Sequence, residues 1–243
     1  MSDYRTRIYE YYVNARQQSL APESLAGLKP REAYLKKLIR EHFPKNHEAK
    51  ILDLGCGHGA LIYFAQSMGY SNVIGVDRSP EQVKAAKNLN IEGVKQGDLI
   101  ELLNSLANDS CDVIITFDVI EHFKKEELLI FVDEVRRVLK TGGKWIIHTP
   151  NGESPFGSRI YFCDFTHELA FTRQSVSQLL LASGFKQVQC FEDKPVVHGM
   201  KSTVRLVLWE LIRGILRLYQ AVETGDSGSN CIFSQNFLTV ADK

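Results

Sequence analysis

Short apolar runs along the chain alternate with segments in which apolar residues recur every three or four positions. The runs have the length of strands, and the segments between them have the period of helices. Helices that separate strands in this way favour a doubly wound, mostly parallel sheet of the α/β class. The predicted strands are 51–54, 72–77, 94–97, 111–117, 144–148, 185–191 and 232–240.

Local signals predict where helices begin and end. Ser79 followed by Pro80 predicts a helix start, because serine accepts a hydrogen bond from the first turn and proline fits the first helical position. The pair Gly142-Gly143 predicts the end of an amphipathic helix. The predicted helices include 31–43, 124–139, 175–183 and 204–222, with two more after residues 59 and 79.

The pattern also divides the chain into three parts. Residues 1–48 carry helical spacing and an aromatic, charged tract, and we expect an N-terminal helical cap there. Residues 49–192 hold the core of alternating strands and helices, and 193–243 hold an apolar helix and the final strand. The segments 151–173 and 193–203 have no regular period, so we expect them to form a lid over a binding pocket.

The most informative stretch is residues 51–59, Ile-Leu-Asp-Leu-Gly-Cys-Gly-His-Gly, in which glycines alternate at Gly55, Gly57 and Gly59. Glycine permits positive φ and lets a ligand approach the backbone closely. A strand, a glycine turn and a helix in this order predict a binding site at the carboxyl end of a central strand. The spacing is G-x-G-x-G, whereas dinucleotide-binding folds carry G-x-G-x-x-G.

Two acids end the next strands. Asp77 lies 18 residues after Gly59, where a carboxylate can accept both hydroxyls of a ribose. Its alternative role is to stabilise a helix N-terminus. Asp98 follows Gly97 at the end of the third strand, where it can bind the exocyclic amine of adenine or serve as a solvated turn residue.

Composition narrows the range of partners and compartments. The 243-residue chain has 29 Lys+Arg and 29 Asp+Glu, so no overall basic field favours nucleic acid. Its five cysteines are scattered without a CxxC pair, which argues against a disulfide framework or a zinc knuckle. No secretory signal and no long apolar run is visible, and we expect a cytoplasmic protein.

A candidate reaction site follows the fourth strand. Asp118, Glu121 and His122 stand at positions i, i+3 and i+4, so a helical turn would place them on one face. A second polar cluster at 164–173 contains His167. His148, at the end of the fifth strand, can face the same site or be a satisfied core histidine.

Together these motifs resemble the class I S-adenosylmethionine-dependent methyltransferases, over roughly residues 35–192. The resemblance rests on the segments 53–59, 76–77, 97–98, 117–122 and 139–143. It implies a seven-stranded Rossmann-like sheet with an antiparallel last strand, N-terminal helices and a C-terminal helical or lid insertion. It also implies S-adenosylmethionine as cofactor, with Asp77 on the ribose and Asp98 near the adenine. The predicted cofactor-binding residues are Asp53, Gly55, Cys56, Gly57, Gly59, Asp77, Arg78, Gly97, Asp98, Leu99, Phe117 and Asp118.

Within this family, the two polar clusters are similar to the metal-dependent O-methyltransferases of small RNA and of the ubiquinone pathway. Carried over, the ligands of one divalent cation (Mg, Mn, Fe or Zn) would be Asp118, Glu121, His122 and His167. The first position is Asp where those families usually have Glu, so its reach is shorter. Without a metal, Glu121 and the two histidines remain catalytic candidates, with His122 or His167 as general base.

The acceptor side supports several alternatives. We predict an O-methyltransferase acting on a hydroxyl of a sugar or glycan. A quinol or other aromatic small molecule, a 3′-terminal ribose of RNA, and a non-catalytic cofactor-binding module are the alternatives. The apolar helix 204–222, with interspersed arginines, would pack on its own domain, form a dimer or lie on a membrane surface. The tail after it is similar to that of bacterial methyltransferases found with surface-polysaccharide assembly.

Overall fold

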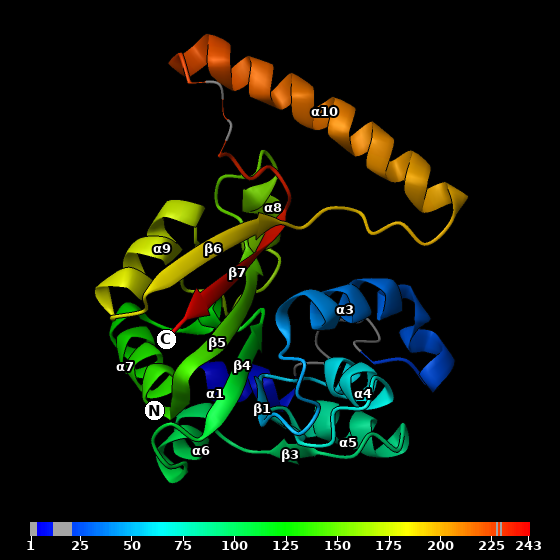
Figure 1. Ribbon diagram of the computed structural model, residues 1–243, viewed down its shortest axis with the longest axis vertical. Helices are drawn as coiled ribbons and strands as arrows, with labels where there is room; N and C mark the ends of the chain where they lie inside the picture. Colours follow the sequence, from blue (N-terminus) through cyan, green and yellow to red (C-terminus); the bar gives the residue numbers. More distant parts are fainter. Residues whose placement is uncertain (1–3, 12–20, 227, 229) are drawn as a thin grey trace.

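A computed structural model describes residues 4–11, 21–226, 228 and 230–243. Among these residues a seven-stranded sheet has the order β3-β2-β1-β4-β5-β7-β6, and β7 runs antiparallel to both neighbours (Figure 1). This confirms the predicted doubly wound, mostly parallel α/β sheet. The strands are β1 (Ile51–Leu54), β2 (Val73–Asp77), β3 (Val94–Gln96), β4 (Cys111–Phe117), β5 (Leu139–Pro150), β6 (Gln187–Glu192) and β7 (Asn236–Asp242).

Helices cover both faces of the sheet. One apolar layer joins the sheet to α3, α4 and α5, and the other joins it to α6, α7 and α9 (Figure 1). The described helices are α1 (Tyr4–Glu10), η1 (Leu25–Leu28), α3 (Lys29–His42), α4 (Ala60–Ser67), α5 (Pro80–Asn88), α6 (Leu99–Ser105), η2 (Ile120–His122), α7 (Lys125–Val138), α8 (Gly157–Tyr161), α9 (Arg173–Ala182) and α10 (Met200–Thr224). The predicted division at residues 48 and 192 remains a prediction, and residues 1–3 and 12–20 of the expected cap lie outside the described residues.

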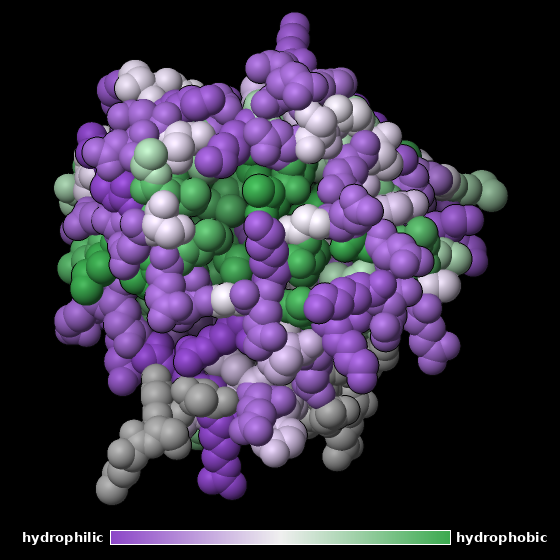
Figure 2. Space-filling model, turned by 90° about the horizontal axis from the view of Figure 1, so that it is seen from below, coloured by the Kyte–Doolittle hydropathy of each residue, from purple (hydrophilic) through white to green (hydrophobic). Residues whose placement is uncertain are grey.

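The core is mainly apolar, and the polar atom of its largest fully buried side chain has a partner. Trp145 of β5 is fully buried between the rings of Phe131 and Phe185, and its indole N–H donates to Thr116 Oγ1 at 3.1 Å. Because the indole nitrogen has a partner, this large side chain is buried without an unsatisfied donor. Seen from below, the surface has a band of hydrophobic residues across its centre, with hydrophilic residues on both sides (Figure 2).

The predicted helix stop at Gly142-Gly143 is wrong. Helix α7 already ends at Val138, and the chain continues directly into β5 because Leu139 pairs with Cys111 of β4. The glycines lie inside β5, next to a register shift in that pairing. A Cβ at Gly143 would lie 2.8 Å from the carbonyl oxygen of Lys140. Glycine is therefore required there for close backbone approach.

The last strand also begins later than the predicted residue 232. The side-chain amide of Asn151 donates to the carbonyl oxygens of Ile232 and Ser234 at 2.7 and 2.9 Å, and its backbone N–H donates to Gln235. These bonds hold residues 232–235 as a loop. The strand ladder starts at Asn236, opposite Pro150.

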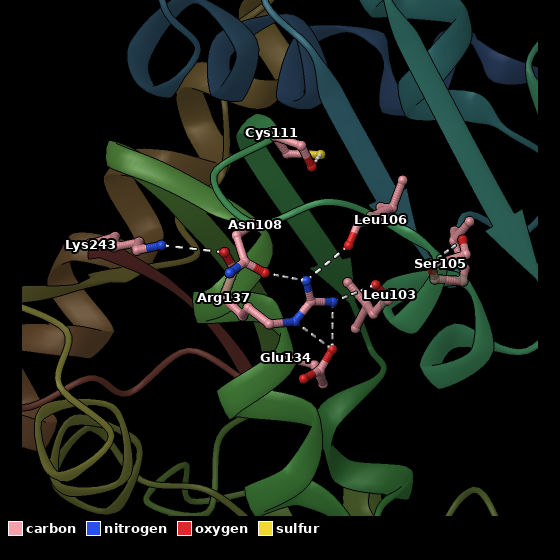
Figure 3. A network of polar contacts seen from close by, with 10 residues as sticks. Leu103, Ser105, Leu106, Asn108, Cys111, Glu134, Arg137 and Lys243 are labelled. Atoms are coloured by element: carbon pink, nitrogen blue, oxygen red, sulfur yellow. Dashed lines mark hydrogen bonds and ion pairs between the residues drawn. The ribbon is translucent and has the colours of Figure 1, made fainter.

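One guanidinium fastens the α6–β4 connection to α7. Arg137 donates to the carbonyl oxygens of Leu103 and Leu106 at 2.7 and 2.8 Å, and it also bonds Asn108 and Glu134 (Figure 3). The carbonyls lie at the C-terminal end of α6, where backbone acceptors lack the usual donor four residues on, although Leu103 also accepts the N–H of Leu106 at 3.0 Å. A single planar donor group therefore satisfies both of them.

We expect Arg137→Ala to lower the free energy of unfolding by about 2 kcal/mol, because it removes charge-assisted bonds to backbone acceptors. Urea denaturation followed by circular dichroism measures the change. The matched control is Lys84→Ala, at an exposed position of α5. Equal stabilities of the two variants would show that the Arg137 network contributes no stability.

Candidate active site

The glycine turn opens a cavity of about 350 Å³ at the carboxyl ends of β1, β2 and β4. Ten of the twelve predicted cofactor-binding residues line it: Asp53, Gly55, Cys56, Gly57, Asp77, Arg78, Asp98, Leu99, Phe117 and Asp118. The two others do not line the cavity. Gly59 packs against β3, where a Cβ would lie 2.7 Å from Val94, and Gly97 faces Val76.

The turn needs glycine for conformation and for space. The φ angles of Gly55, Gly57 and Gly59 are 77°, 55° and 80°, in the left-handed region that favours glycine. A Cβ at Gly55 would also lie 2.4 Å from Val119 Cγ2. Any side chain at this position would clash with the residue that follows Asp118.

Asp77 braces the turn against the next helix. Its Oδ2 accepts the N–H of Gly57 and its Oδ1 accepts the N–H of Ser79, both at 2.8 Å. Burial raises the pKa of Asp77, while these two N–H groups oppose the rise. Asp98 caps α6, and its Oδ1 accepts the N–H of Ile100 at 2.9 Å. Both carboxylates keep acceptor capacity for a ligand, since each oxygen has two lone pairs.

Asp53 lies on the buried floor of the same cavity. Burial, followed by the charge of Asp77, raises its pKa to about 7, and the guanidinium of Arg31 opposes this rise. Its Oδ1 is buried and has no hydrogen-bond partner among the described residues. A buried carboxyl with a free oxygen next to a cavity is a candidate ligand contact.

Asp118 leaves β4 with a left-handed backbone and pairs with a histidine. Its φ is 53°, and its Oδ1 lies 2.7 Å from His148 Nδ1. His148 Nε2 lies 3.5 Å from Asp193, and the imidazole stacks on Phe117 with ring centroids 4.6 Å apart. Burial alone would lower the pKa of His148, but the carboxylates of Asp118 and Asp193 outweigh it and raise the pKa to about 10.

A second cluster lies beside this pair. One ligand atom from each of Glu121, His122 and His167 falls within 4.8 Å of the others. The predicted fourth member, Asp118, is not part of this cluster, because its carboxylate is directed to His148. The i, i+3, i+4 spacing misplaced it because Ile120–His122 forms a 3-10 turn that begins only after the left-handed residue.

Hydrogen bonds fix how both histidines of the cluster face it. His122 Nδ1 lies 2.8 Å from Thr166 Oγ1, and this hydroxyl donates in turn to Asp164. His167 Nδ1 lies 2.8 Å from the carbonyl oxygen of Tyr161, which can only accept. In each ring Nδ1 faces an acceptor and would carry a proton, which leaves Nε2 directed at the cluster as a possible ligand atom.

The carboxylate of the cluster is only partly satisfied. Glu121 is fully buried; its Oε2 accepts from Thr149 Oγ1 at 3.0 Å, and its Oε1 has no partner among the described residues. Burial, followed by the charge of Asp118, raises the pKa of Glu121 well above its usual range. Burial, followed by the neighbouring His167, lowers the pKa of His122 to about 4. The cluster therefore holds the His122 imidazole, whose lowered pKa favours its neutral form, next to a buried carboxyl group whose pKa is raised.

The chain is similar in sequence and in fold to known proteins. Residues 52–147 match the family described as a methyltransferase domain. A probable S-adenosylmethionine-dependent methyltransferase of Mycolicibacterium smegmatis is 31% identical over 138 residues, which are 56% of this chain and 51% of that protein. Residues 52–147 therefore carry a methyltransferase domain, and the chain has the fold of S-adenosylmethionine-dependent methyltransferases of known structure.

One further sequence relative and one solved structure are also similar to this chain. Cyclopropane-fatty-acyl-phospholipid synthase of Escherichia coli (strain K12) is 32% identical over 113 residues, 46% of this chain and 29% of that protein. The chain thus spans about half or less of the length of both curated relatives. A SAM-dependent methyltransferase structure from Archaeoglobus fulgidus has the same fold, with a TM-score of 0.65 over 90% of this chain and all (100%) of that one, at 20% identity.

Helix α1 lines one side of the site. Arg5 of α1 forms two bonds of 2.7 Å to Glu127 and also donates to the carbonyl oxygen of His122. Tyr9 lies edge-on to the His122 ring, and burial raises the pKa of its hydroxyl to about 12. Both α1 side chains line the cofactor cavity, and neither was predicted from the sequence.

Other lining residues also escaped the sequence analysis. Arg31 and Leu35 of α3, His58 of the turn, and Gln82 of α5 all line the cavity. The pattern predicted the helix 31–43, and the i, i+4 spacing of Arg31 and Leu35 was visible within it. Which face of α3 meets the cavity depends on packing against α4, which no local signal reports.

A second cavity, of about 550 Å³, lies between α10 and the body of the protein. Both predicted lid segments line it, with Ser154 and Phe156 from 151–173 and Asp193 from 193–203. Trp209 of α10 lines it from the opposite side. Tyr34, which also lines it, packs edge-on against both Phe117 and His148. The two cavities are thus separated by a small group of aromatic rings.

We expect the stability that His148 contributes to be present below pH 6.5 and to be lost as the pH rises towards 10, because its pKa is raised on folding. The stability difference between wild type and His148→Gln should therefore shrink across this interval. The upper limit is ~1.4 kcal/mol per pH unit, and solvent near the 48%-exposed Asp118 side chain reduces it. Denaturation curves at pH 6.5, 8 and 9.5 test this, with exposed His47→Gln as control. A constant difference would refute the raised pKa.

Proposed function

We propose that this protein transfers the methyl group of S-adenosylmethionine to a hydroxyl oxygen of a sugar or glycan, with assistance from a divalent cation. The observation that carries the proposal is the donor set beside the cofactor cavity. His122 and His167 present Nε2 lone pairs, and Glu121 presents a buried oxygen without a partner. Methyl transfer to an alcohol needs a group that orients the oxygen and removes its proton, and this set supplies both.

The cofactor cavity supports the first half of the proposal. S-adenosylmethionine supplies a methyl group that its sulfonium charge already activates. Asp77 would accept hydrogen bonds from the ribose hydroxyls, and Asp98 would accept one from the adenine amine. The glycine turn would let the cofactor approach the backbone closely. Arg31 at the cavity wall is placed to pair with the carboxylate of the methionine moiety.

The cluster fits a cation by the chemistry of its donors. Two imidazoles and one carboxylate suit Mn, Fe or Zn, and Mg accepts such a site less readily. The bonds from the two Nδ1 atoms to Thr166 and Tyr161 orient the rings in the way that outer hydrogen bonds orient metal ligands. A bound cation would lower the pKa of an acceptor hydroxyl. Without one, Nε2 of His122 or His167 would accept the proton directly.

The identity of the acceptor rests on the surroundings of the site. The second cavity combines aromatic rings with hydroxyl and amide groups, represented by Phe156, Trp209, Ser234 and Asn236. Stacking surfaces beside hydrogen-bonding groups suit a sugar ring. The net charge of zero counts against RNA as acceptor.

A mass-spectrometric screen of glycans, quinols and short RNA would identify the acceptor class. Methyl transfer to none of them, despite cofactor binding, would favour a non-catalytic module.

We expect Asp77→Asn to weaken S-adenosylmethionine binding by roughly 10- to 100-fold, because it removes charge-assisted hydrogen bonds to the ribose. Isothermal titration calorimetry measures the affinity. Asp133→Asn, at an exposed position of α7, is the matched control and should bind normally. Since Asp77 also braces the turn, a thermal melt of each variant separates lost binding from lost folding. Unchanged affinity in a folded Asp77→Asn variant would remove this residue from the cofactor site.

We expect His167→Ala and Glu121→Gln each to weaken Mn²⁺ binding by at least about tenfold while cofactor affinity stays the same, because each removes one ligand. Equilibrium dialysis with Mn²⁺ measures the first and calorimetry the second, with His47→Ala as control. A chelator should stop methyl transfer, and added cation should restore it. Transfer that survives the chelator but not the substitutions would assign these residues to proton transfer alone. Transfer that survives all three treatments would exclude the cluster from the reaction.

A further inference from the structure

Helix α10 carries the largest set of exposed apolar side chains in the described part of the chain. With 100° between successive residues, these side chains fall within a sector of roughly 140°. The helix has 25 residues, which makes this face about 37 Å long. The exposed apolar residues are Met200, Val204, Val207, Leu208, Leu211, Ile212, Ile215, Leu218, Tyr219 and Val222.

The opposite side of α10 is the side that meets the protein. Arg213 bonds Glu192 at 2.5 Å, and Glu210 pairs with Lys194 at 2.8 Å. Trp209 lines the cavity between α10 and the body, and it is half-buried. These contacts fix the rotation of the helix so that its apolar face looks away from the body. Figure 1 shows α10 at one extremity of the molecule.

The first half of the apolar face is bordered by basic residues. Lys201 and Arg205 are exposed along one edge near the start of α10, and the exposed acid Glu223 lies on the same edge near its end. Glu210 is engaged by Lys194 behind the helix. An apolar sector bordered by Lys and Arg is the pattern of helices that lie in the headgroup region of anionic membranes. None of the described helices is both long and apolar enough to cross a bilayer.

We propose that α10 lies flat on a bilayer containing anionic phospholipid, with its apolar face among the acyl chains and its basic edge at the headgroups. The breadth of the face favours this occupant over a second copy of α10. A two-helix contact covers a narrow seam, here Val204, Leu208, Leu211, Ile215, Leu218 and Val222. It would leave Val207 and Tyr219 in water, whereas Ile212, at the border of the sector, also lines the second cavity. A bilayer covers the whole sector.

This placement also specifies the acceptor, in a step that rests on the proposed function. The second cavity lies on the inward side of α10. An amphiphilic acceptor anchored in the same membrane, with a hydroxylated headgroup and an acyl or polyprenyl chain, would therefore enter between the helix and the body without leaving the surface. Membrane binding can be measured without any acceptor, so the two proposals can fail separately.

The test is flotation of the full chain with vesicles of phosphatidylcholine alone and of phosphatidylcholine with phosphatidylglycerol. Wild type should float with the mixed vesicles, and binding to neutral vesicles should be at least about fivefold weaker. Leu211→Glu combined with Ile215→Glu should reduce binding more than about tenfold, because two buried apolar side chains are replaced by anions. Val222→Glu, at the exposed end, should give a smaller loss.

The matched control is Ile130→Glu on α7, which changes an equally exposed apolar residue (59%) elsewhere on the surface and should float like wild type. Calorimetry with S-adenosylmethionine confirms that each variant is folded. The proposal is overturned if wild type does not float with anionic vesicles, or if the double variant floats as well as Ile130→Glu. A concentration-dependent dimer in analytical ultracentrifugation, abolished by the double variant and accompanied by no flotation, would assign the face to self-association instead.

Discussion

The arrangement of the site depends on how the chain leaves the central strand β4. Asp118 takes a left-handed conformation immediately after Phe117, a conformation that costs a non-glycine residue of order 1 kcal/mol or more. This turn sends the Asp118 carboxylate to His148 on β5 and sends the following residues, Glu121 and His122, to the other side. The close approach of Val119 to Gly55 belongs to the same turn, so the glycine loop and the polar cluster constrain each other.

The same turn keeps two kinds of electrostatics apart. Around His148 the charges are compensated, because one imidazolium lies between the carboxylates of Asp118 and Asp193. Around Glu121 they are not, since its carboxyl group is fully buried and the charge of Asp118 raises its pKa more than His148 lowers it. A buried carboxylate without a compensating charge destabilises the folded state unless a proton or a cation neutralises it. This asymmetry supports the proposed cation site at the cluster over one at the His148 network.

Local sequence signals predicted much of the fold, and ten of the twelve predicted cofactor-binding residues line one cavity. The fourth strand was predicted at its observed bounds, and the cap of α5 by Ser79 was predicted from the Ser-Pro pair. Residues just after strand ends line the cavity because the parallel topology brings those ends together. The errors came from contacts between distant segments. A Cβ at Gly143 would lie 3.0 Å from the carbonyl oxygen of Asp112 on the neighbouring strand, and Asn151 holds residues 232–235 out of the ladder. Neither has a signature in its own neighbourhood.

The acceptor side is built on the connection between β6 and β7. These two strands are antiparallel neighbours at one edge of the sheet, and a long excursion that contains α10 joins them. That excursion carries Asp193 back to His148 before α10 begins. The ion pair to His148 is therefore what ties the start of the excursion to the cofactor side, with Tyr34 and Phe117 packed around it. Asp193 and Tyr34 line the second cavity, and Asp118 lines the first. Under the proposed function, the Asp118–His148–Asp193 network would therefore connect the acceptor to the methyl donor.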